Sequence, residues 1–177
     1  PKVTLERTFK TKIEEKEGEQ KNVLWHSFVA PFDIPASSLE GWEVKELVSS
    51  SRDGETVNLF FGNATDGIKA GVPYMVRNVN QMDTLTFFSM ENVVVNTELK
   101  NTTAGVVEFV GTYTKMDIPE GAFFISSNQF WYAKDGSNTT KAFRAYMKPT
   151  VANARAMNYR MGGTTAIDDA QLTNDNE

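Results

Sequence analysis

The sequence predicts an all-β fold: an antiparallel, jelly-roll-like β-sandwich of about 10–12 strands. Three observations support this prediction. Apolar and polar residues alternate with a period of two in many short segments, turn-forming residues separate these segments at intervals of ~8–15 residues, and no long amphipathic helical pattern occurs. Twenty aromatic residues among 177 (12 Phe, 5 Tyr and 3 Trp) supply ample material for a core. A chain of this length is sufficient for one domain without disulfides, and it contains no Cys.

The alternation is clearest at the start of the chain. Val3, Leu5, Arg7 and Phe9 occupy every second position and are separated by polar residues, which predicts a half-buried strand. The charged segment Lys12–Lys21 has no apolar stripe, so we expect a polar hairpin loop there. Further strands are expected at Val23–Val29, Trp42–Val48, Glu55–Phe61, Val72–Arg77, Thr84–Met90, Val93–Leu99, Val106–Thr112, Ala122–Ser126, Gln129–Ala133, Ala142–Lys148 and Arg155–Met161.

The domain organisation follows from composition. No linker rich in Pro, Gly or Ser divides residues 1–161, so we expect one β-sandwich domain there, followed by a flexible acidic tail at 162–177. The tail has four acids and no base, and the whole chain has a net charge of −5, which leaves a nearly neutral body. This body has no basic surplus for a phosphate backbone, so we expect no nucleic-acid partner. No apolar run approaches the ~18 residues of a membrane-spanning helix.

Two segments resemble each other. Val57–Gly62 is followed by Ile68–Tyr74, and Val106–Gly111 is followed by Ile118–Phe124; both pairs give a strand, a turn, Ile-x-x-Gly-x-x-aromatic and a further strand. The pattern predicts that the glycine of each turn, Gly71 and Gly121, adopts a positive φ. A duplicated binding loop is one interpretation. A tight corner used twice in one sandwich is the interpretation we favour.

Few residues suggest catalysis. The single imidazole, His26, is adjacent to Ser27 on a predicted strand, so the two side chains point to opposite faces and cannot pair. Glycoside hydrolysis needs two carboxylates ~5–9.5 Å apart, and none of the 23 acids stands out as a pair. The acidic turns at 53–55 and 66–67 lack the ligand spacing of an EF-hand loop. We therefore expect no catalytic residue, no cofactor and no metal site, although loop-bound Ca²⁺ stays open.

Aromatic residues are the remaining candidates for ligand binding. In Phe130-Trp131-Tyr132 the middle ring of a strand must face away from the other two. Trp131 and Tyr132, together with Trp42, are therefore the candidate binding residues. Each ring belongs either to the core or to an exposed surface where it stacks on a sugar or anchors a protein. Arg144 is expected to lay its stem along the strand face shared with Tyr146, the alternative being a plain surface charge.

Seven segments, taken in order, resemble those of a known module: Val3–Phe9, Trp25–Ile34, Ile68–Val76, Phe109–Tyr113, Ile118–Gly121, Ala142–Tyr146 and Thr164–Ile167. The chain is similar to the β-sandwich modules of secreted and surface-exposed Bacteroidetes proteins, adhesin-like domains often found C-terminal to leucine-rich repeats. It departs from their pattern at His26-Ser27, at Ala30 and in the longer Lys12–Lys21 loop.

The resemblance implies a secreted or cell-surface location and a non-catalytic role. The implied partners are other domains of a larger surface protein, with a glycan or a host protein as ligand. Asp83-Thr84-Leu85 resembles the O-glycosylation site of that phylum, which makes Thr84 a candidate for modification. The sequence thus favours an interaction or structural module. The alternatives are a carbohydrate-binding module that uses exposed Trp or Tyr rings and, least favoured, a carboxylate-dependent glycoside hydrolase.

Overall fold

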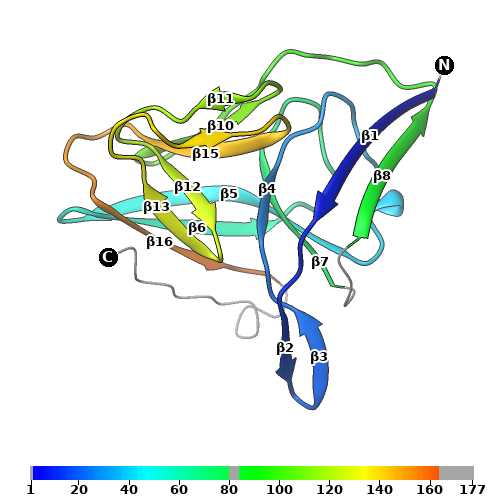
Figure 1. Ribbon diagram of the computed structural model, residues 1–177, viewed down its shortest axis with the longest axis horizontal. Helices are drawn as coiled ribbons and strands as arrows, with labels where there is room; N and C mark the ends of the chain where they lie inside the picture. Colours follow the sequence, from blue (N-terminus) through cyan, green and yellow to red (C-terminus); the bar gives the residue numbers. More distant parts are fainter. Residues whose placement is uncertain (1, 80–83, 164–177) are drawn as a thin grey trace.

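The computed structural model describes the backbone of residues 2–79 and 84–163, and all side chains in these ranges except those of 84–87 (Figure 1). These residues form sixteen strands and one short helical turn, η1 (Ala36–Ser38). None of the described helical structure is long and apolar enough to cross a membrane. The expected all-β class is confirmed. The expected tail at 162–177 lies outside the described part except for its first two residues.

Two five-stranded sheets form the body (Figure 1). All neighbouring strands pair antiparallel except β16 and β6, which are parallel. The first sheet runs in the order β13 (Gln129–Tyr132), β12 (Phe123–Ser126), β15 (Arg144–Pro149), β10 (Val107–Thr112) and β9 (Thr102–Ala104). The second runs in the order β16 (Ala156–Met161), β6 (Thr56–Asn63), β5 (Trp42–Asp53), β7 (Tyr74–Asn78) and β4 (His26–Phe28).

Three pairs of strands surround this body. The antiparallel pair of β1 (Lys2–Phe9) and β8 (Thr84–Glu91) forms a long ribbon beside it. The hairpin of β2 (Ile13–Lys16) and β3 (Glu19–Asn22) projects from the body and carries the expected polar segment (Figure 1). The short pair of β11 (Met116–Asp117) and β14 (Thr139–Thr140) completes the set.

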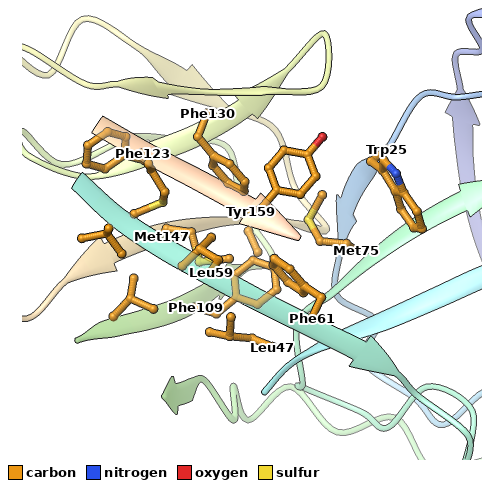
Figure 2. Close-up of a cluster of buried hydrophobic side chains, with 14 of the residues drawn as sticks. Trp25, Leu47, Leu59, Phe61, Met75, Phe109, Phe123, Phe130, Met147 and Tyr159 are labelled. Atoms are coloured by element: carbon orange, nitrogen blue, oxygen red, sulfur yellow. The ribbon is translucent and has the colours of Figure 1, made fainter. Parts of the chain in front are cut away.

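The main core lies between the two large sheets (Figure 2). Phe61 of β6 meets Phe109 of β10 edge to face, with ring centroids 6.1 Å apart. Phe130 of β13 meets Tyr159 of β16 in the same way at 5.5 Å. These contacts join the inner faces of both sheets, which is the arrangement of a β-sandwich. A second core lies under the β1–β8 ribbon and includes Phe9, Phe28 and Phe88.

The structure differs from three strand predictions. Residues 93–99 are not a strand: Val94 is 83% exposed, and the segment is tied down by single hydrogen bonds such as Asn96 N–H to the Pro31 carbonyl. Its β-branched residues favour an extended chain, but no neighbouring strand completes a ladder. β5 does not end at Val48 but continues to Asp53, past a bulge between Leu47 and Ser49. Only His26–Phe28 of the expected strand at 23–29 is a strand.

The internal similarity corresponds to one corner in each sheet. The first copy connects β6 to β7, and the second connects β10 to β12. Ile68 and Ile118 are both 1% exposed, so each anchors its turn to the interior. Gly71 and Gly121 have φ of +81° and +88°, as the pattern predicts.

Candidate functional site

The three predicted binding rings lie in different places. Trp131 lies on β13, at the edge of the first sheet, and is 40% exposed. Its neighbour Phe130 points into the core. Trp131 Nε1 donates a hydrogen bond to the Ser126 carbonyl at 2.9 Å, which fixes the indole on the outer surface. Tyr132 faces the opposite side, where it packs against Phe123 at 5.3 Å between ring centroids.

Trp42 lies on the other sheet, at the start of β5. It is half-buried and packs on Phe9 and Phe88, with ring centroids 4.8 and 5.7 Å apart. Its ring therefore belongs largely to the second core, and only its margin reaches a surface hollow beside Glu43 and Lys45. Trp42, Trp131 and Tyr132 do not line one common site. Of the three, Trp131 offers the most open ring surface.

One hollow on the described surface is a cleft of about 640 Å³, which we call the arginine cleft. It lies where β1, β4, β12, β14 and β15 meet. Four of its lining residues are basic and one is acidic. The basic residues are Arg7, Lys10, Lys141 and Arg144, the acid is Glu6, and the remainder are His26, Thr8, Ser27, Ile118, Phe124, Ile125, Ser126, Thr139, Thr140 and Ala145.

Arg7 is the most buried of these cations, at 7% exposed. It occupies an inward position of β1, where the alternating pattern otherwise places Leu5 and Phe9. Its Nη1 donates to the carbonyls of Ser27 at 2.7 Å and Phe143 at 3.1 Å, and its guanidinium carbon lies 4.4 Å from the centre of the Phe9 ring. Its buried Nε has no hydrogen-bond partner.

No described carboxylate forms an ion pair with Arg7 or Arg144. Arg144 is half-buried, as the strand pattern predicts, and its Nη1 donates to the Ala142 carbonyl at 2.8 Å. Burial lowers the pKa of both guanidinium groups, and repulsion from Arg144 lowers the pKa of Arg7 further. The cleft therefore holds two desolvated cations without a counter-ion among the described residues.

His26 and Ser27 take different partners, as expected for neighbours on a strand. One ring nitrogen of His26 lies 2.8 Å from the Lys10 carbonyl oxygen, and the ring meets Phe9 edge to face. The Ser27 hydroxyl accepts a hydrogen bond from the Ala145 N–H at 3.0 Å. The hydroxyl thus links β4 to β15 and is not activated by the imidazole.

Acidic side chains in the described part of the chain do not converge on a metal site. No group of three or more metal-ligating side chains occurs there. The hollows that contain Glu6, Glu43 or Glu120 have one described carboxylate each, and the hollow beside Ser50 and Tyr159 has none. The described residues around these hollows thus supply no carboxylate pair for glycoside hydrolysis. The acidic segments at 53–55 and 66–67 are turns, with Gly54 and Gly67 at positive φ.

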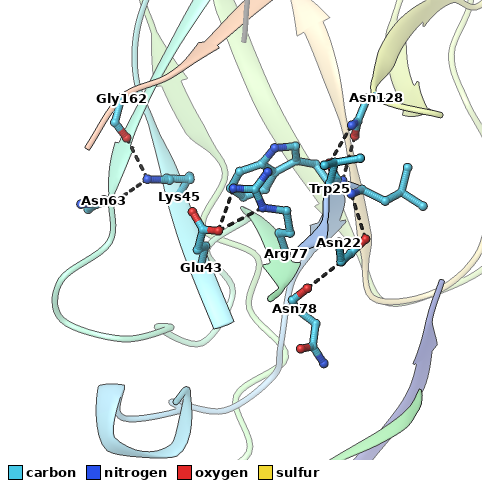
Figure 3. A network of polar contacts seen from close by, with 11 residues as sticks. Asn22, Trp25, Glu43, Lys45, Asn63, Arg77, Asn78, Asn128 and Gly162 are labelled. Atoms are coloured by element: carbon cyan, nitrogen blue, oxygen red, sulfur yellow. Dashed lines mark hydrogen bonds and ion pairs between the residues drawn. The ribbon is translucent and has the colours of Figure 1, made fainter. Parts of the chain in front are cut away.

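A separate polar network braces the sandwich (Figure 3). Asn128 accepts from the Trp25 N–H at 2.8 Å and donates to the Val23 carbonyl at 2.7 Å, which ties the β12–β13 turn to the chain before β4. Lys45, although 2% exposed, donates to the Gly162 carbonyl at 2.8 Å and to the Asn63 side chain. These side chains satisfy buried polar groups, which is a structural role.

Comparisons with protein-family models, with curated proteins and with solved structures find no match for this chain. The resemblance to Bacteroidetes surface modules therefore stays a prediction. Asp83 and the side chain of Thr84 lie outside the described part, so the expected O-glycosylation site has no structural description.

The sequence pattern did not predict the arginine cleft. Arg7 carries the only signal of it, a charged residue in the apolar register of a half-buried strand. Arg144 was expected to lie along its strand, but nothing in the pattern indicates that β1 and β15 bring the two guanidinium groups to one cleft. Their meeting depends on long-range strand packing.

Proposed function

We propose that the chain is a non-catalytic interaction module of a secreted or cell-surface protein, and that its binding surface is the outer face of β12 and β13. The observation that carries this proposal is Trp131, whose indole is 40% exposed yet held in place by its bond to the Ser126 carbonyl. A large aromatic ring that is already ordered contributes apolar contact area with little further loss of side-chain entropy.

The neighbourhood of Trp131 supports a binding role. Phe124 lies directly opposite Trp131 in the β12–β13 register, so both rings are on the same face of the sheet. Phe124 and Ser126 of β12 also line the arginine cleft. The cleft therefore borders the strand that pairs with the Trp131 strand, β13. The proposed surface thus combines an exposed ring with a neighbouring concave site.

Carbohydrate is the ligand class that this surface favours. Flat indole faces stack on sugar rings, and the hydroxyls of Ser126, Thr139 and Thr140 in the cleft can donate to or accept from sugar hydroxyls. The resemblance to Bacteroidetes surface modules supports the adhesin-like role and the extracellular location. A host-protein ligand or a purely structural role as a spacer between domains are the competing functions.

The test is a binding screen of the folded chain against a glycan panel and a set of extracellular host proteins. We expect glycan binding that falls at least tenfold in Trp131→Ala, because a central aromatic anchor typically contributes about 2 kcal/mol or more. Phe60→Ala is a matched control, since Phe60 is 38% exposed on the other sheet. Equal binding by wild type and Trp131→Ala, or no binding to any panel member, would contradict the proposal.

A further inference from the structure

Four cations and one acid line the arginine cleft, although the chain as a whole has a net charge of −5. Positive charge is thus concentrated at one place on an acidic protein. The described part offers no carboxylate that pairs with Arg7 or Arg144, and two guanidinium groups repel each other there. Holding such charges away from water is costly unless an anion compensates them.

Arg7 is fixed rather than free to swing into solvent. Its Nη1 is anchored by the Ser27 and Phe143 carbonyls, and Phe9 covers one face of the guanidinium. Its Nε is buried without a partner, so the hydrogen-bonding capacity of the group is incompletely used. Arg7 is thus held at the cleft by carbonyl groups and an aromatic ring, without a described carboxylate partner.

We propose that the arginine cleft binds the acidic group, a carboxylate or a sulfate, of an anionic saccharide. This inference rests on the proposed function and specifies its ligand class. Guanidinium groups present parallel N–H donors that match the oxygens of carboxylates and sulfates. Arg7 and Arg144 supply this recognition, and Lys10 and Lys141 add positive charge at the exposed margin.

The rest of the lining favours a sugar over an acidic peptide. Ser126, Thr139 and Thr140 provide hydroxyl groups suited to the remaining sugar hydroxyls, and Phe124 provides an apolar surface beside Trp131. The cleft volume of about 640 Å³ lies in the range of small-ligand sites. Phe124, which lies opposite Trp131 in the strand register, connects the cleft to the face that carries the exposed indole.

The test is isothermal titration calorimetry of the full chain with an oligogalacturonate, a sulfated chondroitin oligosaccharide, a carboxyl-reduced oligogalacturonate and a poly-glutamate peptide. We expect the two acidic saccharides to bind at least tenfold more tightly than the reduced saccharide. The affinity for the acidic saccharides should fall as NaCl concentration rises, because salt screens the charges at the cleft margin. The first two probes distinguish a carboxylate from a sulfate ligand.

Variants then locate the site. Arg144→Gln should weaken binding of the acidic saccharide about tenfold to hundredfold, the range for a lost charged hydrogen bond. Lys141→Gln, at an exposed position of the cleft, should weaken binding of the acidic saccharide severalfold. This variant still tests the location of the site if Arg144→Gln folds poorly. Arg160→Gln is the matched control, because Arg160 is exposed on β16, at the opposite edge of the second sheet from β4.

Each outcome is decisive. Equal binding of the reduced and the acidic saccharides would overturn the inference while the proposed function stands. Binding of poly-glutamate as tight as that of the acidic saccharides would overturn the saccharide assignment. Unchanged affinity in both Arg144→Gln and Lys141→Gln would overturn the location. Absence of binding to any saccharide, together with a negative glycan and protein screen, would overturn the proposed function as well.

Discussion

The guanidinium of Arg77 lies over the indole of Trp25, with 4.3 Å between its carbon and the ring centroid (Figure 3). Trp25 is 2% exposed and precedes β4, whereas Arg77 belongs to β7. Glu43 of β5 holds the same guanidinium, with Oε1 2.7 Å from Nη2 and 3.1 Å from Nε. The three side chains therefore link β5, β7 and the start of β4 on one side of the main core.

Removal of the Glu43 charge tests this link. We expect Glu43→Gln to lower the free energy of unfolding by about 1–2 kcal/mol, the range for a charged hydrogen bond that solvent partly screens. Glu46→Gln is the control, because Glu46 is exposed on the same strand. Urea unfolding measures both variants. A loss in Glu43→Gln no larger than that in Glu46→Gln would show that the contact does not stabilise the fold.

The two similar corners give a second test. A Cβ on Gly71 would collide with the Glu98 carbonyl oxygen and would also require a φ of +81°. At Gly121 the φ is +88°, but the space around a Cβ is open. Gly121→Ala should cost about 1 kcal/mol of backbone strain, whereas Gly71→Ala should cost more than about 2 kcal/mol. Thermal unfolding of both variants measures the difference, and equal losses would contradict the predicted clash.

Tyr159 gives the stability a specific dependence on alkaline pH. Burial raises the pKa of its phenol well above the usual value of about 10, and its hydroxyl donates to the Asn128 carbonyl at 2.8 Å. Above pH ~10 the unfolded chain releases this proton and the folded chain keeps it. The contribution to stability is therefore complete below that pH and is lost as pH rises toward the folded-state pKa.

Tyr159→Phe checks this dependence. The variant should lose about 1 kcal/mol near neutral pH, because the bond to Asn128 is removed. Above pH ~10 its stability should fall less steeply with pH than that of the wild type. Urea unfolding across the alkaline range measures both slopes. Parallel curves for the two proteins would show that Tyr159 does not control the alkaline response.

The exposure of Trp131 can be checked without a ligand. Trp25 is 2% exposed and Trp42 is half-buried, so we expect acrylamide to quench the fluorescence of Trp131 first. Trp131→Phe should remove most of the readily quenched emission, whereas Trp25→Phe should leave it in place. Equal quenching of wild type and Trp131→Phe would show that the indole is not open to solvent.

The period-two pattern predicted much of the fold because it depends on local chemistry. The alternation at residues 3–9 correctly predicted that Leu5, Arg7 and Phe9 are the buried positions of β1. The same rule placed Trp131 on the face opposite Phe130. It failed at residues 93–99, where an extended, β-branched segment has no neighbouring strand to pair with. Strand propensity is satisfied there, but a strand also requires a partner.

Residue types a few positions apart were enough to predict the all-β class, the corners at Gly71 and Gly121 and the inward side of strands such as β1, because these are local properties. The choice of neighbouring strands did not follow from these local patterns. The parallel pairing of β16 with β6 and the meeting of Arg7 with Arg144 are examples. Alternation specifies a face but no partner, because the partner is selected by packing between segments distant in the chain.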